Sequence, residues 1–301
     1  MRIIEAFDSA LRSVAVSPDG RFVAASADRS WGVFDWFTGE PLFRLAAPAP
    51  VVQFAFDPAG RWLACGWAGQ PLTLIELEPV QSRTALVSNH AGGVVVSPDG
   101  KKLLATQGAP GARAKLAVWE LPGLKARSGY DDWPPFARLA LSRNGEFVAG
   151  IWSGVPHHFR PNPATFEIRY AASGGKDYHF PPLGGPTYRV PGFISFTRDS
   201  DTCAFGWERE FHVLDLGTRT TRYVRRVEAR YTGAAFTGSG HQFATVEDTG
   251  LLKLWDGRTW QVTREYDWQC GPLTCLAFTA DGSAGACGTT DGRLVQFDVD
   301  E

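Results

Sequence analysis

Two groups of side chains in this chain are of types that bind metal ions: a pair of adjacent histidines and five cysteines. Adjacent side chains on an extended segment point in different directions, so His157 and His158 do not form a chelating pair, and no third ligand is identifiable beside them. Cys270 and Cys275 have no second Cys or His cluster to complete a tetrahedral site. We expect no metal ion and no other cofactor, and we expect buried, reduced cysteines.

Two further stretches are candidates for phosphate or nucleic-acid binding. The glycine-rich segment 108–115 lacks the Gly-Lys-Ser/Thr ending of a phosphate-binding loop and opens no helix. The strongest basic run falls on an expected outer edge strand, where charge resists sheet-to-sheet aggregation; it contains Arg219, Arg222, Arg225, Arg226 and Arg230. Because the net charge is −2 and few aromatic residues are interleaved with the arginines, we expect no nucleic-acid partner.

No Ser/His/Asp or Cys/His arrangement can be read along the chain. Catalytic groups can converge from distant segments, however, so this observation alone leaves catalysis open. What chemistry is possible therefore depends on the elements that position the side chains.

A four-residue turn recurs seven times and divides the chain into repeats. Ser17-Pro18-Asp19-Gly20 and Ser97-Pro98-Asp99-Gly100 are clear copies, in which Pro presets φ, Asp suits the second central position and Gly closes the turn. The seven copies end at Gly20, Gly60, Gly100, Gly145, Ser200, Gly240 and Gly282. A period of roughly 40 residues with several short strands per unit predicts a β-propeller.

The residues around each turn predict the strands of one repeat. Apolar residues alternate before the turn, as at Val14 and Val16, which predicts a first strand, a. The fourth residue after the turn predicts close packing of strand b, since six of seven are alanine: Ala24, Ala64, Leu104, Ala149, Ala204, Ala244 and Ala286. Strand c is expected to end in an apolar residue and an acid: Phe34-Asp35, Ile75-Glu76, Trp119-Glu120, Phe166-Glu167, Leu214-Asp215, Trp255-Asp256 and Phe297-Asp298.

This pattern resembles the WD40-repeat family, whose repeats end in Trp-Asp after an alanine-rich second strand; Trp255-Asp256 is a literal copy. The resemblance covers essentially all 301 residues and implies an all-β fold, a single domain over 1–301 and seven four-stranded antiparallel blades. The last repeat supplies only strands a, b and c. We therefore expect Arg2–Asp8 to be strand d of that C-terminal blade and to close the propeller. The divergent style of the repeats resembles bacterial members.

The resemblance also implies that b–c and d–a connections open on one face, the top. Extra length falls in Gln107–Ala114, Ser128–Phe136, Gly154–Ala164 and Ala171–Gly192, all assigned to connections on that face of blades 3 to 5. Tryptophan ends strand b in three repeats, at Trp67, Trp152 and Trp207. As exposed interface anchors these would be surrounded by Trp133, His157, Arg160 and Tyr178. The alternative is that the inserted loops cover the tryptophans as a small extra core.

We interpret the chain as a non-catalytic scaffold that binds a protein or peptide on the top face over blades 3–5. The alternative is a propeller enzyme or small-molecule binder that uses the central channel mouth, where Arg138 is the one charged residue in the predicted register. A purely structural subunit of an assembly is a third hypothesis. Without a signal-peptide-like start or a segment able to span a membrane, we expect a cytoplasmic protein, monomeric on its own, with no membrane partner.

Overall fold

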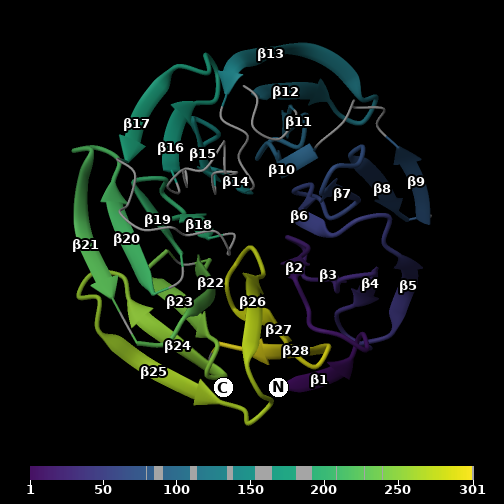
Figure 1. Ribbon diagram of the computed structural model, residues 1–301, viewed down its shortest axis with the longest axis vertical. Coiled ribbons are helices and arrows are strands. Elements are labelled where there is room, and N and C mark those ends of the chain that lie inside the picture. The colour runs from purple at the N-terminus through teal and green to yellow at the C-terminus, as the bar shows by residue number, and fades with distance from the viewer. Residues whose placement is uncertain are drawn as a thin grey trace, which may run out of the picture. The chain divides into compact units, whose positions relative to one another are not determined.

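The computed structural model describes residues 1–78, 80–84, 91–108, 114–133, 138–152, 165–180, 192–207, 209–226, 228–238 and 240–299. Every regular element in these ranges is a β-strand, and the strands form seven four-stranded sheets, the predicted all-β, seven-bladed β-propeller class (Figure 1). We number the blades 1 to 7 along the chain. The chain divides into two compact units, Met1–Val51 with Ser195–Glu301, and Val52–Ile194, which are described separately.

The first unit contains blades 1, 5, 6 and 7. Blade 1 consists of β2 (Ser13–Val16), β3 (Phe22–Ser26), β4 (Ser30–Asp35) and β5 (Pro41–Ala46). Blade 5 consists of β18 (Phe193–Phe196), which begins at the boundary of the units, β19 (Thr202–Trp207), β20 (Glu210–Asp215) and β21 (Thr220–Arg226). Blade 6 consists of β22 (Tyr231–Phe236), β23 (Gln242–Glu247), β24 (Leu251–Asp256) and β25 (Val262–Asp267). Blade 7 consists of β26 (Leu273–Phe278), β27 (Ala284–Thr289), β28 (Arg293–Asp298) and β1 (Arg2–Glu5).

The second unit contains blades 2, 3 and 4. Blade 2 consists of β6 (Val51–Phe56), β7 (Trp62–Trp67), β8 (Thr73–Leu77) and β9 (Val80–Thr84). Blade 3 consists of β10 (Ala91–Val96), β11 (Lys102–Gln107), β12 (Ala114–Glu120) and β13 (Lys125–Trp133). Blade 4 consists of β14 (Arg138–Leu141), β15 (Phe147–Trp152), β16 (Thr165–Tyr170) and β17 (Lys176–Phe180). In every blade the a–b turn lies at one end of the sheet, the turn end, and the b–c connection lies at the other, the b–c end. In blades 1 to 6 the c–d turn also lies at the turn end, whereas strand d of blade 7 is supplied by β1.

The expected pairing of the two chain termini is confirmed. Strand β1 pairs antiparallel with β28, with Arg2 opposite Gln296 and Glu5 opposite Arg293 (Figure 1). The strand is shorter than predicted, because pairing ends at Glu5, although the Phe7 N–H still donates to the Gly292 carbonyl at 3.0 Å. Residues from the start of the chain therefore complete the last sheet.

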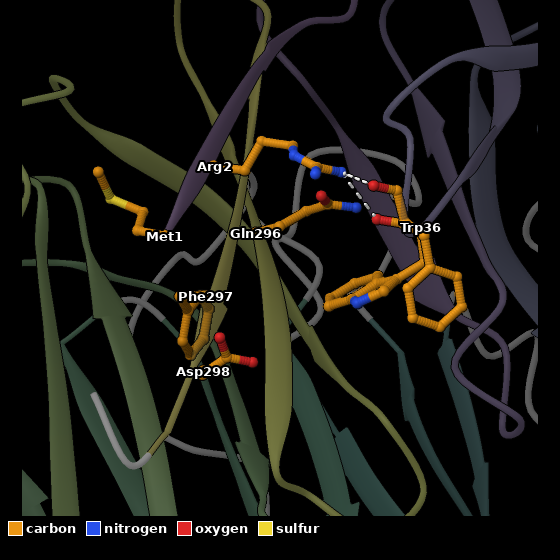
Figure 2. Close-up of a pocket in the computed structure, with 7 residues that line it drawn as sticks. Met1, Arg2, Trp36, Gln296, Phe297 and Asp298 are labelled. Carbon is orange, nitrogen blue, oxygen red and sulfur yellow. Dashed lines mark hydrogen bonds between the residues drawn. The ribbon is translucent and has the colours of Figure 1, made fainter.

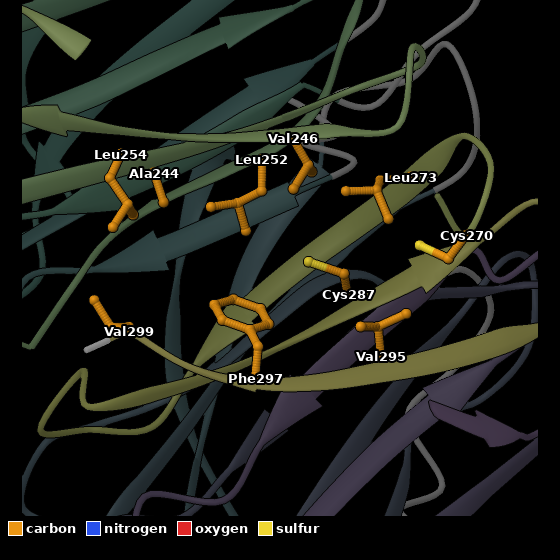
Figure 3. Packing of buried hydrophobic residues seen from close by; sticks show 10 residues of the cluster. All are labelled: Ala244, Val246, Leu252, Leu254, Cys270, Leu273, Cys287, Val295, Phe297 and Val299. Carbon is orange, nitrogen blue, oxygen red and sulfur yellow. The ribbon is translucent and has the colours of Figure 1, made fainter. Parts of the chain in front are cut away.

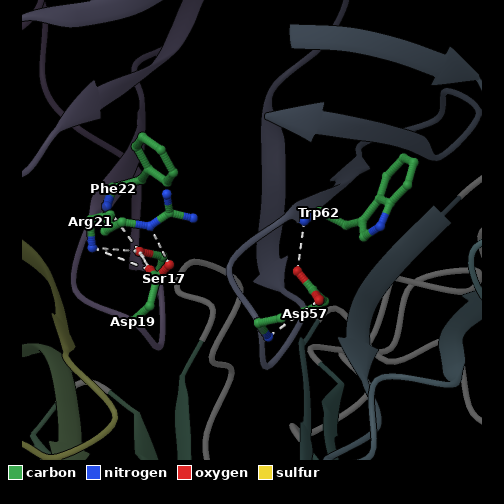
Figure 4. Close-up of polar contacts among 7 residues, drawn as sticks. Ser17, Asp19, Arg21, Phe22, Asp57 and Trp62 are labelled. Atoms are coloured by element: carbon green, nitrogen blue, oxygen red, sulfur yellow. Dashed lines mark hydrogen bonds and ion pairs between the residues drawn. The ribbon is translucent and has the colours of Figure 1, made fainter. Parts of the chain in front are cut away.

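The recurring turn is held by the side chain of its first residue. In blade 1 the Ser17 hydroxyl donates to Asp19 Oδ1 at 2.6 Å and accepts the Phe22 N–H at 2.9 Å (Figure 4). Gly20 closes the turn with φ of 70°, a backbone conformation that glycine adopts without strain. In blade 2, Asp57 replaces the serine and accepts the Trp62 N–H directly at 2.6 Å (Figure 4). The turn residues thus fix where strand b begins.

Strand b is deeply buried, as the alanine pattern predicts. The seven residues of that register are each at most 4% exposed, namely Ala24, Ala64, Leu104, Ala149, Ala204, Ala244 and Ala286. Between blades 6 and 7 the small side chain of Ala244 packs with Leu252, Leu273 and Phe297 in one apolar cluster (Figure 3). A larger residue in this register would have to displace close-packed neighbours.

The predicted end of strand c is wrong in blade 4. In blade 1, Phe22 lies opposite Asp35, and the same register in blade 4 places Phe147 opposite Tyr170. The acid position of blade 4 is therefore Tyr170, three residues beyond the predicted Glu167. Glu167 instead lies mid-strand, buried, and binds the Arg169 guanidinium at 2.9 and 3.0 Å. The long b–c connection of blade 4 moves the end of strand c further along the chain. The pair Phe166-Glu167, which lies inside the strand, resembles the apolar–acid pair that ends strand c in the other blades.

Candidate functional site

The three tryptophans predicted to end strand b do so, but Trp67 is not at the surface. It is the last residue of β7, is 2% exposed, and its indole N–H donates to Thr73 Oγ1 at 2.9 Å. A buried tryptophan with a satisfied N–H contributes to the core of blade 2. In this position Trp67 offers no area to a partner.

Two other predicted residues lie at matching ends of neighbouring blades. Trp133 is the last residue of β13, opposite Ala114, and Trp152 is the last residue of β15, opposite Thr165. Both positions are therefore at the b–c ends of blades 3 and 4, within one unit. Trp207 holds the equivalent position in blade 5, opposite Glu210. The structure describes the backbone of these three residues and not their side chains.

Of the remaining predicted site residues, two lie outside the described residues and one lies on an outer strand. His157 and Arg160 lie outside the described residues, as do most of the inserted segments, 109–113, 153–164 and 181–191. Tyr178 lies in the middle of outer strand β17, opposite Ile168, and is half-buried. The assignment of Ala171–Gly192 to a single d–a loop is thus wrong, because residues 176–180 pair with β16 as strand d.

The assignment of Ser128–Phe136 to a connection is wrong for the same reason, because β13 extends to Trp133. Tyr130, in that strand, packs between blades 3 and 4: its hydroxyl lies 2.9 and 2.8 Å from the Ala171 and Ala172 carbonyls. A Cβ on Gly174 would lie 2.6 Å from its ring, so the glycine makes room for the tyrosine. Tyr130 therefore joins two blades.

The side chains best suited to redox or acid–base chemistry are buried in apolar surroundings. Burial raises the pKa of the thiols of Cys65, Cys203 and Cys287 well above the ordinary value, which keeps them protonated. Among the described residues, no three His, Cys, Asp or Glu side chains are grouped to hold a metal ion. His212 lies 2.6 Å from Glu210 but is 3% exposed and stacked on Phe205.

Sequence reasoning missed a pocket of about 260 Å³ at the turn end of blade 7, beside the c–d turn of blade 1 (Figure 2). It is lined by Met1, Arg2, Trp36, Phe37, Gln296, Phe297 and Asp298, all of the same unit. Residues from both chain termini meet here only because β1 pairs with β28. The available sequence signal was Phe37, an aromatic residue two positions after the acid Asp35, where the other repeats have no aromatic side chain.

The c–d turn that borders this pocket is held by several hydrogen bonds. Asp35 Oδ1 accepts the backbone N–H groups of Phe37 and Thr38 at 2.9 and 2.8 Å. The Arg2 guanidinium donates to the Trp36 carbonyl at 3.2 Å and to the Phe37 carbonyl (Figure 2). Hydrogen-bond donation from the Thr38 N–H is the main reason that the pKa of Asp35 lies below its ordinary value. Desolvation of the carboxylate opposes this effect, and the positive charge of Arg2 adds to it. The turn is therefore anchored to β1.

Comparison with known proteins agrees with the repeat pattern. The family described as "WD domain, G-beta repeat" matches residues 1–35, which span β1 to β4. The proteins named "Small ribosomal subunit protein RACK1" from Trypanosoma brucei brucei and Trypanosoma brucei rhodesiense are each 29% identical over 121 residues. That stretch is 40% of this chain and about a third of the length of each relative.

Within the described ranges there is no helix long and apolar enough to cross a membrane. The seven turn-flanked repeats, the four-stranded blades and the match at residues 1–35 agree with one another. The fold is a seven-bladed β-propeller, and the chain is similar to the WD40-repeat family.

Proposed function

We propose that this protein is a non-catalytic scaffold whose protein or peptide partner docks at the b–c ends of blades 3 and 4. The observation that carries the proposal is the position of Trp133 and Trp152 at the same ends of two neighbouring blades. Tryptophan gives large contact area at little cost in conformational entropy and is enriched among the energetically dominant residues of interfaces. WD40 propellers and the RACK1 relatives support a role in protein interaction generally.

The length of the chain at these ends also supports the proposal. Tyr170 lies 25 positions after Gly145, whereas Asp35 lies 15 positions after Gly20, so blade 4 has ten additional residues near its b–c end. His157 and Arg160 belong to that additional segment. Long connections on a rigid sheet scaffold commonly carry recognition residues. Tyr178 would contribute from the outer strand, at the side of the same blade.

Trp67 does not belong to this surface because it is buried, and Trp207 does not belong to it because blade 5 is in the other unit. The name of the relatives suggests a ribosomal partner. Since the match spans about a third of their length, that association is one outcome of the experiment and not an assumption. The central-channel alternative would require polar side chains free to meet a ligand, and Gln53, in that register, already binds backbone groups.

Affinity capture from native lysate followed by mass spectrometry tests the proposal. It compares the wild type with a Trp133→Ala, Trp152→Ala double variant and a Trp207→Ala variant. Trp67→Phe is a control at a buried position. The melting temperature of each variant is measured, so that a loss of partners can be distinguished from a loss of folded protein. The proposal expects partners that the wild type and Trp67→Phe capture and the double variant loses. Equal capture by all four proteins would place the interface elsewhere. Ribosomal proteins among the lost partners would identify the partner as the ribosome.

A further inference from the structure

The c–d turn of blade 1 presents an aromatic side chain that the fold does not use. Phe37 is 68% exposed at the tip of the turn. Two positions after the end of strand c the other described blades have residues without an aromatic ring: Glu78, Pro122, Ala172, Gly217 and Arg258. Met1, which is also exposed, lines the same pocket. Two of the six large hydrophobic residues that are exposed in the described structure therefore line one pocket, and clustered exposed apolar groups mark interaction surfaces.

This apolar surface is held in a fixed conformation. Asp35 and Arg2 bind the backbone on both sides of Phe37, as described above, and the Gly39 N–H donates to the Asp35 carbonyl at 2.9 Å. A Cβ on Gly39 would lie 3.2 Å from Ile4 Cδ1, so the turn packs directly on β1. A surface that is already ordered loses little conformational entropy when a partner binds.

The floor of the pocket contains a buried hydrogen-bond donor without an acceptor. Gln296 is 5% exposed, and among the described residues its Nε2 has no hydrogen-bond partner. Its side chain lies beside that of Arg2, and both are directed at the Trp36 turn (Figure 2). A buried donor left unsatisfied costs about 1–3 kcal/mol, so a carbonyl oxygen entering the pocket would recover that free energy.

The size and charge of the pocket limit what can occupy it. Its volume of about 260 Å³ is below the range of about 300–1,000 Å³ that is usual for small-molecule and cofactor sites. It can accommodate one or two side chains and the backbone that connects them. The exposed carboxylate of Asp298 lies at its rim, whereas the charge of Arg2 is directed at the turn carbonyls and at Asp35. The carboxylate of Asp298 can therefore pair with a basic group that enters from the rim.

We propose that this pocket binds a short extended segment of a partner protein. The segment places one apolar side chain against Phe37 and Met1, offers a backbone carbonyl oxygen to Gln296 Nε2, and carries a Lys or Arg that pairs with Asp298. This site goes beyond the proposed function, because it lies at the turn end of blade 7 and shares no residue with the b–c ends of blades 3 and 4.

A random dodecapeptide phage library tests the proposal. The library is selected on the full-length wild-type protein and counter-selected on Phe37→Arg, a substitution that introduces the residue found at the same turn position in blade 6. The most enriched sequence is then synthesised with a fluorescent label, and its affinity is measured by anisotropy. We expect enriched peptides to combine an apolar residue with a nearby Lys or Arg.

The affinity of this peptide for four variants decides the outcome. We expect binding at least about tenfold weaker to Phe37→Arg and Gln296→Met, and also to Asp298→Asn, which each remove one of the proposed interactions. Leu45→Ser, at an exposed apolar residue of β5 outside the pocket, is the matched control and should bind within about twofold of wild type. Melting temperatures verify that each variant is folded.

Two results would overturn the proposal: no peptide enriched on wild type over Phe37→Arg, or an enriched peptide that binds Gln296→Met as tightly as wild type. The Trp133→Ala, Trp152→Ala double variant should bind the same peptide unchanged. Loss of binding in that variant would mean that the peptide occupies the b–c ends, which would support the proposed function and contradict this second site.

Discussion

The side-chain amide of Gln53, on β6, binds the backbone of Leu139, on β14, from both of its polar atoms. Nε2 donates to the Leu139 carbonyl at 2.7 Å, and Oε1 accepts the Leu139 N–H at 3.0 Å. Oε1 also accepts the Val94 N–H of β10 at 3.3 Å. One side chain of blade 2 therefore satisfies backbone groups on the first strands of blades 3 and 4, which are edge strands of their sheets.

Replacing this amide should destabilise the Val52–Ile194 unit. Gln53→Leu preserves the approximate volume and leaves three part-buried backbone groups without their partner. We expect a decrease of about 1–3 kcal/mol in the free energy of unfolding, measured by urea denaturation. Ala59→Ser, at an exposed turn position of the same blade, is the control and should change little. An unchanged free energy for Gln53→Leu would show that the amide contacts contribute nothing to stability.

Gly93 provides a second test of the same inner strands. A Cβ at this position would lie 2.6 Å from the Leu139 backbone nitrogen and 2.9 Å from the Arg138 carbonyl carbon, and backbone atoms cannot move aside cheaply. We expect Gly93→Ala to lower the free energy of unfolding by about 1–3 kcal/mol. Gly123→Ala is the matched control, since a Cβ there meets nothing within 4 Å; it should be neutral or slightly stabilising. Equal stability of the two variants would contradict the close approach.

The features that could be predicted from the sequence are those that repeat. The turn residues and the alanine register recur because every blade has the same strands packed in the same way. Seven copies of a weak sequence pattern therefore support one another. The pairing of β1 with β28 followed from the missing fourth strand of the last repeat. Blade 4 was misaligned because its b–c connection is long and the pair Phe166-Glu167 resembles a strand end. When one repeat differs from the others in register, the other repeats cannot be used to locate the end of its strand.

The functional site was harder to predict because burial depends on neighbours far away in the sequence. Trp67 and Trp152 occupy the same register, yet nothing in either residue reveals that Trp67 is covered and hydrogen-bonded to Thr73. The pocket at Gln296 is formed by both termini and by a turn of blade 1. Its unsatisfied amide has no sequence signal, since glutamine in a strand is ordinary.

Removing the first eight residues should sharply lower the melting temperature. The deletion takes away β1, exposes the edge of β28 and uncovers the apolar cluster that Ile4 joins with Phe34 and Leu294. Differential scanning calorimetry measures the effect. Ile3→Ser, which changes an exposed residue of the same strand, is the control and should have a much smaller effect. An intact melting temperature after the deletion would contradict the role of β1 in completing blade 7.

The five cysteines should be unreactive in the folded protein. All five are buried and free, and burial raises the pKa of Cys65, Cys203 and Cys287, so neither access nor thiolate is available. We expect negligible reaction with Ellman's reagent near neutral pH and five equivalents of reaction in guanidinium chloride. Rapid labelling of even one native thiol would identify a segment that opens readily.

The aspartates of the recurring turns should make the protein less stable in acid. Hydroxyl donation from Ser97, Thr197 and Thr279 is the main cause that holds the pKa of their partner aspartates below the ordinary value of 3.8; the partners are Asp99, Asp199 and Asp281. A carboxylate whose pKa is lower in the folded state stabilises the protein fully above its unfolded pKa. That contribution is lost as the pH falls through 3.8 toward the folded value.

Blade 4 suggests the variant that isolates this contribution, because Asn144 already accepts the Ser142 hydroxyl at 2.7 Å in the equivalent turn. A triple variant with Asp99→Asn, Asp199→Asn and Asp281→Asn should therefore fold, with a smaller free energy of unfolding at about pH 7 than wild type. Its loss of stability between about pH 7 and about pH 3 should also be smaller, because three of the titrating groups are gone. Urea denaturation at several pH values measures both quantities. Parallel pH profiles for the two proteins would show that the turn aspartates have the same pKa in the folded and unfolded states.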